Sequence, residues 1–378
     1  MNNSHERLNL PDSLLTKETG IIPHLEYPRG KEALPEKIDT VFWDVDGTIT
    51  DRDIPDPRII QTILQTANQG VNHNFITGRD RFWLEENLKP IFDQVAHEEG
   101  IDINSVLPNI HYFPELGLMS MDPISGEPRE YEGIRDHPLI NSSLRSRIAS
   151  FFLQTRDLLP ADGNTRPPSR HFVIKDANGI RCFCPFRPHD LNPEIKLPDF
   201  IWSDTKELIG TAEVVRDAEG RISPERQAKI LLAAEIINKF LQYWNYHEDI
   251  ILSPVSTAIN IAPVVNGIPL DKDWAIGMIL NQTRESLIRR GKTVTVEDLA
   301  SRSIAIGDGY ADFLFSRPRI ANNQFLDVAF GFVGPKDQMH ENPDKTKNLV
   351  VRSEGYHGPQ ATNDILEQIQ DRFIPALD

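Results

Sequence analysis

Three short apolar runs along the chain share one pattern, in which polar residues beside a glycine follow the run. The runs are VFW (41–43) before Asp44, NFI (74–76) before Thr77-Gly78-Arg79, and SIAI (303–306) before Gly307-Asp308. Short uninterrupted apolar runs are typical of strands that are buried on both faces of a parallel sheet. Because ligands of such sheets bind beyond the carboxyl ends of the strands, the polar residues mark the place of a site.

Helical periodicity separates the first two runs and predicts a βαβ unit. Residues 57–69 have a proline near the start, an apolar face and Gly70 just past the end, which together indicate a helix. A second helix is expected over residues 81–94. The frame is predicted to resume with INIAPV (259–264) and to end with a strand, a turn and a helix over residues 349–369.

A further helix is expected over residues 271–289, with Asp271 as its N-cap. Its apolar stripe has helical spacing and includes Ile276, Ile279, Leu280 and Leu287. Lys272 lies on the same stripe one turn earlier, so we expect it to point toward the sheet at the helix N-terminus. The helix dipole disfavours a lysine there, which favours a functional role over an ordinary surface lysine.

The middle of the chain mixes predicted hairpins with helices. Hairpins are expected over residues 111–131 and 170–186, helices over 139–159 and 224–244, and a strand over 207–215 with a turn at 217–220. The fold class is therefore α/β, with a doubly wound parallel-sheet core and an inserted α+β domain. The predicted boundaries are an N-terminal extension at 1–37, a core at 38–95 and 255–378, and an insertion at 96–254.

The carboxylates near the strand ends are the candidate chemistry. Asp44 and Asp46 project to one side if the chain is extended, and such like charges raise each other's pKa or require a cation. A helix beginning near Gly309 would bring Asp308 and Asp312 together on one face. Taken singly, either pair could also be an ordinary strand end or helix cap.

Composition restricts the partners. The net charge of −16 argues against a nucleic acid or an anionic membrane as the main partner, and an anionic substrate would need local cations. Two cysteines, Cys182 and Cys184, fit a reducing, cytoplasmic location. No signal peptide is visible in the first 36 residues, and no stretch approaches the ~20 apolar residues of a membrane span. The sequence does not predict an oligomeric state.

Four motifs occur in a recognisable order: DVDGT (44–48), the strand ending in Thr77-Gly78-Arg79, Lys272, and GDGYAD (307–312). Together they resemble the motifs of the haloacid dehalogenase (HAD) superfamily of phosphatases. The insertion resembles the type II cap, subtype B, found in Cof-like and sucrose-phosphate phosphatases. The resemblance implies a Rossmann-like HAD core with an inserted α+β cap domain. It departs from the family at Ala311, which is often Asn, and at PELGL (114–118), where Glu-Asn-Gly is more common.

The resemblance also implies roles for individual residues. Asp44 would be the nucleophile that forms an aspartyl-phosphate, and Asp46 the general acid and then base. Thr77 and the Gly78 N–H would bind the phosphoryl oxygens, and Lys272 would neutralise charge on the phosphoryl group and on Asp44.

A Mg²⁺ cofactor is implied as well. Its ligands would be the Asp44 side chain, the Asp46 main-chain carbonyl and Asp308, with Asp312 in support. This cation would explain how Asp44 and Asp46 share one strand end.

The expected function is hydrolysis of a small phosphorylated metabolite, with sugar phosphates as the preferred class because of the cap resemblance. A phosphohexomutase-like phosphoryl transferase is one alternative, since α-phosphomannomutases share the D-V-D-G-T strand. A catalytically silent binding module is another, although every catalytic residue type is present in the chain.

Overall fold

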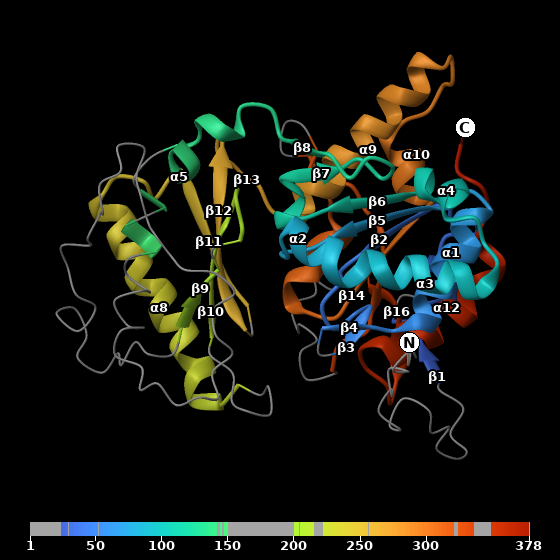
Figure 1. Cartoon of the computed structure of the whole chain (residues 1–378), viewed down its shortest axis with the longest axis horizontal. Helices are drawn as coiled ribbons and strands as arrows, with labels where there is room; N and C mark the ends of the chain where they lie inside the picture. The colour runs from blue at the N-terminus through green and yellow to red at the C-terminus, as the bar shows by residue number, and fades with distance from the viewer. Residues whose placement is uncertain are drawn as a thin grey trace, which may run out of the picture.

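The predicted parallel strands are present, and they form the centre of a large sheet (Figure 1). The computed structural model describes residues 24–149, 200–335 and 349–377, apart from residues 29, 52, 142, 143, 146, 204, 215–221, 256 and 321–323. The sheet has nine strands in the order β1-β16-β15-β14-β2-β5-β6-β7-β8. Their bounds are β1 (His24–Glu26), β2 (Thr40–Trp43), β5 (Asn72–Ile76), β6 (Ile110–Phe113), β7 (Met119–Met121), β8 (Pro128–Glu130), β14 (Ser303–Gly307), β15 (Ala329–Phe332) and β16 (Leu349–Glu354).

The six strands from β16 to β6 run parallel, with β2 between β14 and β5. The side chains of Val41, Phe42 and Trp43 on β2 are fully buried. This burial follows from helices on both faces of the sheet, which explains why the run is uninterruptedly apolar. The carboxyl ends of β2, β5 and β14 meet at one edge, as the three apolar runs predict.

Helices cover both faces of this sheet (Figure 1). One face packs against α1 (Pro57–Asn68), α3 (Lys89–Glu99) and α12 (Pro359–Ile369), and the other against α9 (Lys272–Arg289), α10 (Val296–Ser301) and the 3₁₀ helix η7 (Tyr310–Ser316). The predicted helix at 81–94 is present as α2 (Arg81–Trp83), a π-helical turn η3 (Leu84–Leu88) and α3. The core is therefore a doubly wound α/β layer structure.

Short elements connect these layers. They are the two-stranded ribbon of β3 (Thr50–Asp51) and β4 (Ile54–Pro55), α4 (Ile103–Val106), and the 3₁₀ helices η2 (Lys31–Ala33), η4 (Leu107–Asn109), η5 (Glu115–Gly117) and η10 (Gln370–Arg372). The ribbon directly follows the Asp44–Thr48 segment, and η5 follows β6 at the same edge of the sheet.

A second, smaller sheet lies beside the core and has the order β11-β12-β10-β9, with β13 paired to β12. We call the unit that it forms, the described residues between Ile134 and Leu270, the cap unit. Its elements are η6 (Ile134–Asp136), α5 (Pro138–Asn141), β9 (Phe200–Trp202), β10 (Gly210–Val214), α8 (Pro224–Tyr243), β11 (Ile250–Pro254), β12 (Ala258–Val265) and β13 (Ile268–Pro269). The apolar side chains of one sheet face pack against α8, so this unit has its own core.

Sheet membership differs from the predicted domain boundaries at both ends of the insertion. Strands β6, β7 and β8 belong to the large sheet, although the prediction places residues from 96 onward in the inserted domain. Strand β12 belongs to the small sheet, although INIAPV is predicted to resume the core. Sequence periodicity identifies strands but not their partners, because the partners are distant in the chain.

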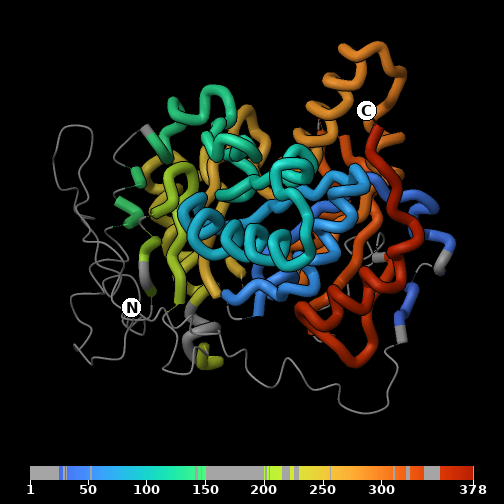
Figure 2. The backbone as a smooth tube through the Cα atoms, turned by 45° about the vertical axis from the view of Figure 1, so that its right-hand side comes forward, coloured from blue at the N-terminus to red at the C-terminus, as the bar shows by residue number. Residues whose placement is uncertain are grey.

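The predicted N-terminal extension also contributes to the core. Strand β1 pairs antiparallel with β16, at the edge of the large sheet. Figure 2 shows this N-terminal segment beside the C-terminal one, and the Ile38–Phe373 bridge joins the same two regions.

Other local predictions are confirmed where they fall on described residues. Helix α8 and strands β7, β8, β10 and β16 lie at the expected positions. The predicted hairpin at 170–186, the turn at 217–220, and both cysteines lie outside the described residues. None of the described helices combines the length and apolar character needed to cross a membrane.

Candidate active site

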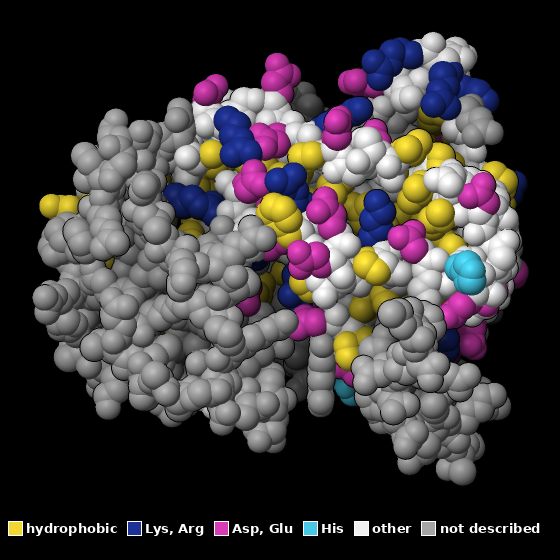
Figure 3. Space-filling model, in the orientation of Figure 1, with side chains coloured by type: hydrophobic (Ala, Val, Ile, Leu, Met, Phe, Trp, Pro, Cys, Tyr) yellow, Lys and Arg dark blue, Asp and Glu magenta, His cyan; other side chains and the backbone are white. Residues whose placement is uncertain are grey.

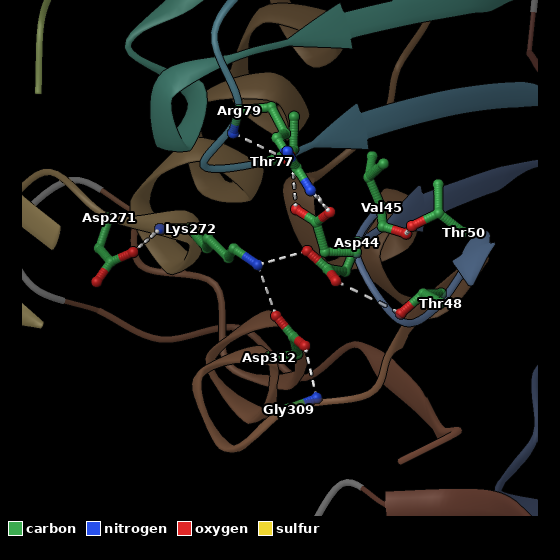
Figure 4. Close-up of polar contacts among 11 residues, drawn as sticks. Asp44, Val45, Thr48, Thr50, Thr77, Arg79, Asp271, Lys272, Gly309 and Asp312 are labelled. Atoms are coloured by element: carbon green, nitrogen blue, oxygen red, sulfur yellow. Dashed lines mark hydrogen bonds and ion pairs between the residues drawn. The ribbon is translucent and has the colours of Figure 1, made fainter. Parts of the chain in front are cut away.

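Asp44 lies directly after β2, where the backbone N–H of Asp44 donates to Ile306 O of β14 at 2.9 Å. Asp44 is buried, with a side-chain exposure of only 6%. It lies at the carboxyl edge of the sheet, and Figure 4 shows Lys272 and Asp312 pointing toward it. A carboxylate in this position is buried by the sheet and faces the region where α/β folds bind ligands.

Lys272 is the first residue of α9 and is held there by its neighbour Asp271. The Asp271 carboxylate caps the helix by accepting the Lys272 N–H at 2.7 Å. The Lys272 ammonium donates to Asp44 Oδ1 at 2.6 Å and to Asp312 Oδ1 at 2.7 Å (Figure 4). Burial lowers the pKa of Lys272, but the Asp312 and Asp44 carboxylates outweigh this effect and raise it overall. The predicted direction of Lys272, toward the sheet, is confirmed.

Three carboxylates lie close together here, and two of them contact this ammonium. One oxygen each from Asp44, Asp308 and Asp312 lie within 4.8 Å of one another. Burial and the Asp312 charge raise the pKa of Asp44 to about 7, and the same two causes raise the pKa of Asp308. Asp308 and Asp312 are thus brought together as predicted. Asp312 lies on η7, and its carboxylate accepts the Gly309 N–H at 2.8 Å.

The donor set fits a hard divalent cation such as Mg²⁺. Carboxylate oxygens are the ligands that Mg²⁺ prefers, and this cluster brings three acids together with one contacting ammonium. Gly47 adopts a φ of 75°, and a Cβ at this position would collide with the Asp308 carboxylate. The glycine of DVDGT therefore keeps open the space in which the Asp308 carboxylate approaches the Asp44 loop.

The Thr-Gly-Arg motif follows β5 at the same edge. Thr77 is fully buried, and its hydroxyl oxygen accepts the Arg79 N–H at 3.1 Å. Arg79 holds Asp46 through its Nε and through its Nη2, the latter at 2.6 Å, and it also contacts Asp53 (Figure 4 shows the Arg79 guanidinium). The Asp46 carboxylate therefore turns to Arg79 and is not in contact with Lys272 among the described side chains. Sequence reasoning gave Arg79 and Asp53 no role, because nothing local in the sequence predicts their contact with Asp46.

Sequence reasoning also missed a contact between the core and the cap unit. The Glu115 carboxylate is 1% exposed and accepts the N–H groups of Glu207, Leu208 and Ile209 at 2.6–3.0 Å. Its own N–H donates to Arg79 O at 2.9 Å, so Glu115 links the Thr-Gly-Arg loop to the cap unit. The signal in the sequence is PELGL, where the chain departs from the family pattern.

Comparisons with known proteins give distant structural matches. No family model and no curated protein sequence matches the chain. Solved structures that resemble it include a trehalose-6-phosphate phosphatase from Aspergillus fumigatus, at 13% identity and a TM-score of 0.42, covering 90% of this chain and 96% of that one. Similarity this low carries no information about reaction or substrate.

Two further solved structures have similarly low sequence identity to this chain. A haloacid dehalogenase-like hydrolase from Bacteroides thetaiotaomicron is 16% identical, has a TM-score of 0.38, and covers 76% of this chain and 90% of that one. An IMP-bound mutant of the IMP-nucleotidase from Plasmodium falciparum is 10% identical and has a TM-score of 0.47. The match covers 89% of this chain and 68% of that one.

The structure itself provides the firmer observations. Helices cover both faces of a mostly parallel sheet, and a second unit with its own sheet is inserted between β8 and α9. The three strand ends that carry DVDGT, Thr-Gly-Arg and GDGYAD converge with the start of α9, and the Lys272 ammonium contacts both Asp44 and Asp312. In motif order, in sheet topology and in the meeting of these side chains, the chain has the features that its resemblance to haloacid dehalogenase-type phosphatases implies.

Proposed function

We propose that this chain is a Mg²⁺-dependent HAD-type phosphatase, a phosphoric monoester hydrolase that acts on a small phosphorylated metabolite. The observation that carries the proposal is the buried Lys272 ammonium between Asp44 and Asp312, at the strand edge that also holds Thr77 and Asp308. A buried nucleophile, a fixed cation and a set of oxygen ligands are the parts that phosphoryl transfer requires.

Asp44 carries out the first step in this proposal. One Asp44 carboxylate oxygen attacks phosphorus, the bond to the leaving alkoxide breaks, and an aspartyl-phosphate forms. Asp46 donates a proton to the leaving oxygen and later removes one from the water that hydrolyses the intermediate. Both Asp46 oxygens accept hydrogen bonds from Arg79, but Oδ2 accepts only from the Arg79 Nε and keeps a lone pair for proton transfer.

The surrounding groups stabilise charge. Lys272 offsets negative charge on Asp44 and on the phosphoryl oxygens, and Thr77 with the Gly78 N–H donates hydrogen bonds to those oxygens. When bound, Mg²⁺ supplies further positive charge at the phosphoryl group, held by the Asp44 and Asp308 side chains and the Asp46 carbonyl, with Asp312 in support. The cap unit covers this edge and excludes water.

Sugar phosphates are the proposed substrate class, and the cytoplasm is the proposed location, from the cap resemblance and the cysteine usage respectively. The proposal is tested by measuring phosphate release from a panel of phosphomonoesters, with and without Mg²⁺, using Asp44→Asn as the blank. We expect Mg²⁺-dependent release that the Asp44→Asn variant lacks. Release that is equal in both proteins would refute the assignment of Asp44, and formation of hexose 6-phosphate from hexose 1-phosphate would indicate a mutase instead.

A further inference from the structure

One face of the small sheet carries a row of polar side chains. Asn260 on β12 lies opposite Thr211 on β10 and opposite Ser253 on β11, so the three are neighbours on one face. The Thr211 hydroxyl donates to Asn260 Oδ1 at 3.0 Å. The alternate residues, such as Ile259 and Ile261, are buried in the core that this sheet forms with α8.

This face is turned toward the proposed phosphatase site. The Asn260 amide nitrogen lies 4.0 Å from the position that a Cβ on Gly78 would occupy. At the other end of the row, the Ser253 hydroxyl donates to Asp271 Oδ2 at 3.2 Å. Asp271 caps the helix that carries Lys272, as Figure 4 shows. The row therefore contacts both the Thr-Gly-Arg loop and the start of α9.

Lys206 extends the row and is unusual among the described lysines. Its side chain is buried, with 7% exposure, and the ammonium donates to Thr211 Oγ1 at 2.7 Å. No carboxylate among the described residues forms an ion pair with Lys206, whereas Lys272 contacts two. Burial lowers the pKa of Lys206, although Glu213 and Glu115 act in the opposite direction. A buried ammonium that lacks a contacting acid is costly and has donors left for a ligand.

The loop that carries Lys206 is held from both sides. Glu115 of the core accepts the N–H groups of residues 207–209. Arg145 of the cap unit donates to Ile209 O at 2.7 Å and to the carbonyl of Lys206 itself. These contacts fix the backbone at Lys206, and a fixed binding group loses less entropy when a ligand binds.

We propose that Lys206, Thr211, Asn260 and Ser253 form the leaving-group subsite of the proposed phosphatase, on which this inference rests, and that Lys206 binds an anionic oxygen of the leaving group. The preferred substrates are therefore phosphomonoesters that carry a second acid group, either a carboxylate or a second phosphate. Thr211 and Asn260 lie between this charge and the Thr-Gly-Arg loop, where they can bind hydroxyl groups of a sugar.

The test compares binding of matched ligands to an inactive protein. Asp44→Asn in Mg²⁺ buffer is titrated by calorimetry with 6-phosphogluconate against glucose 6-phosphate, and with fructose 1,6-bisphosphate against fructose 6-phosphate. These pairs separate a carboxylate from a second phosphate as the source of the charge. We expect at least one diacid to bind about 10-fold or more tightly than its partner, because a charge-assisted hydrogen bond is gained.

Adding Lys206→Met should remove this preference and leave binding of the monophosphate partner unchanged within about 2-fold, while Lys206→Arg should retain part of it. The control is Lys292→Met, because Lys292 is exposed. Absence of a preference in Asp44→Asn overturns the proposal. An equal loss for both members of each pair also overturns it, because Lys206 would then contact the transferred phosphoryl group or serve only the structure.

Two further measurements keep this subsite separate from the phosphatase proposal. The free energy of unfolding of Lys206→Met should be no lower than that of the unsubstituted protein, because the substitution removes a buried charge without an ion-pair partner. A clear loss of stability would overturn the binding role. Binding with the expected preference but no phosphate release from the unsubstituted protein would contradict the phosphatase and support the subsite. Release from all four esters at equal efficiency would overturn the subsite alone.

Discussion

Lys272 and His73 show how single residues are placed by surroundings that the local sequence does not contain. Lys272 lies 228 residues from Asp44 in the chain but contacts it at 2.6 Å. His73 is fully buried, accepting a hydrogen bond from Trp43 Nε1 at its Nδ1 and lying 3.0 Å from the Thr66 hydroxyl at its Nε2. The neutral ring with a proton on Nε2 satisfies both contacts.

Removal of the Lys272 charge is expected to impair catalysis directly. Lys272→Ala leaves Asp44 and Asp312 without the ammonium that they share, and it removes positive charge next to the phosphoryl group. We expect kcat/KM to fall by about 100-fold or more, measured by phosphate release at saturating Mg²⁺. Lys292→Ala is the control, and a loss confined to a few-fold would show that Lys272 has only a structural role.

His73 predicts a dependence of stability on pH. Burial lowers the pKa of His73 from 6.5 to about 3 in the folded chain, so the unfolded chain binds the proton first as the pH falls. The stabilising contribution of the neutral ring is therefore complete above pH 6.5 and is lost as the pH falls toward 3. Between pH 6.5 and 5 the loss amounts to about 2 kcal/mol.

Urea unfolding at several pH values measures this effect. His73→Phe cannot titrate, so the difference in unfolding free energy between it and the unsubstituted protein should shrink by that amount on acidification. His97→Gln, at an exposed position, should leave the pH dependence unchanged. Identical pH profiles for the His73→Phe variant and the unsubstituted protein would contradict this assignment.

Among the elements, η5 is the one that the sequence pattern describes least well. Glu115, Leu116 and Gly117 have successive φ values of 53°, 62° and 89°, all in the left-handed region. The Leu116 N–H donates to Thr77 O at 2.8 Å, and Gly117 packs against Ala275 of α9. Contacts with β5, α9 and the cap unit thus hold a conformation that non-glycine residues rarely adopt.

Two glycines with positive φ allow backbone strain to be separated from steric collision. A Cβ at Gly117 would collide with the Cβ of Ala275, whereas at Gly126, with a φ of 72°, it would meet nothing within 4 Å. We expect Gly126→Ala to cost about 1 kcal/mol and Gly117→Ala about 1–3 kcal/mol more, because α9 must shift. Urea unfolding measures both, and equal costs would show that α9 accommodates the methyl group.

On the scale of the whole molecule, polar contacts join the core and the cap unit. Glu115 accepts three N–H groups of the cap unit, Arg81 lies 3.3 Å from the Glu207 carboxylate, and Thr205 contacts Asp80. On the face displayed in Figure 3, acidic and basic side chains of the described residues are interspersed over the middle of the surface, and basic side chains gather at the upper right, where Figure 1 draws the end of α9. The net charge of the chain is −16, so it repels an anionic ligand. The buried cations near the site, Lys272 and Lys206, supply the local positive charge that offsets this repulsion.

Glu115 is expected to control how firmly the cap unit is docked. Glu115→Ala removes the acceptor for the amides of residues 207–209, and these groups would then be buried without partners. We expect their hydrogen exchange to accelerate by about 10- to 100-fold, with smaller changes in β2 and β14. Glu285→Ala, on the exposed side of α9, is the control, and unchanged exchange at residues 208 and 209 would refute the docking role.

Local sequence patterns are enough to predict most core elements and the order of the chemical groups along the chain. Apolar runs, proline and glycine positions and helical stripes predicted β2, β5, β14, α1 and α9, because these signals act over a few neighbouring residues. The same locality placed Asp44, Thr77 and Asp308 at strand ends, put Asp312 in the helix that follows, and turned Lys272 inward. A resemblance in motif order was enough to anticipate that these side chains meet.

Long-range packing sets which strands pair and which charges are neutralised. Strands β6, β7 and β8 joined the large sheet and β12 the small one, because strand pairing depends on partners that are distant in the sequence. The engagement of Asp46 by Arg79, the docking of Glu115 and the unpaired burial of Lys206 depend on the same long-range packing. Burial of a charged side chain costs free energy, or strengthens its binding to a partner, only when water around it is replaced by protein groups. Those groups come from parts of the chain that are distant in the sequence.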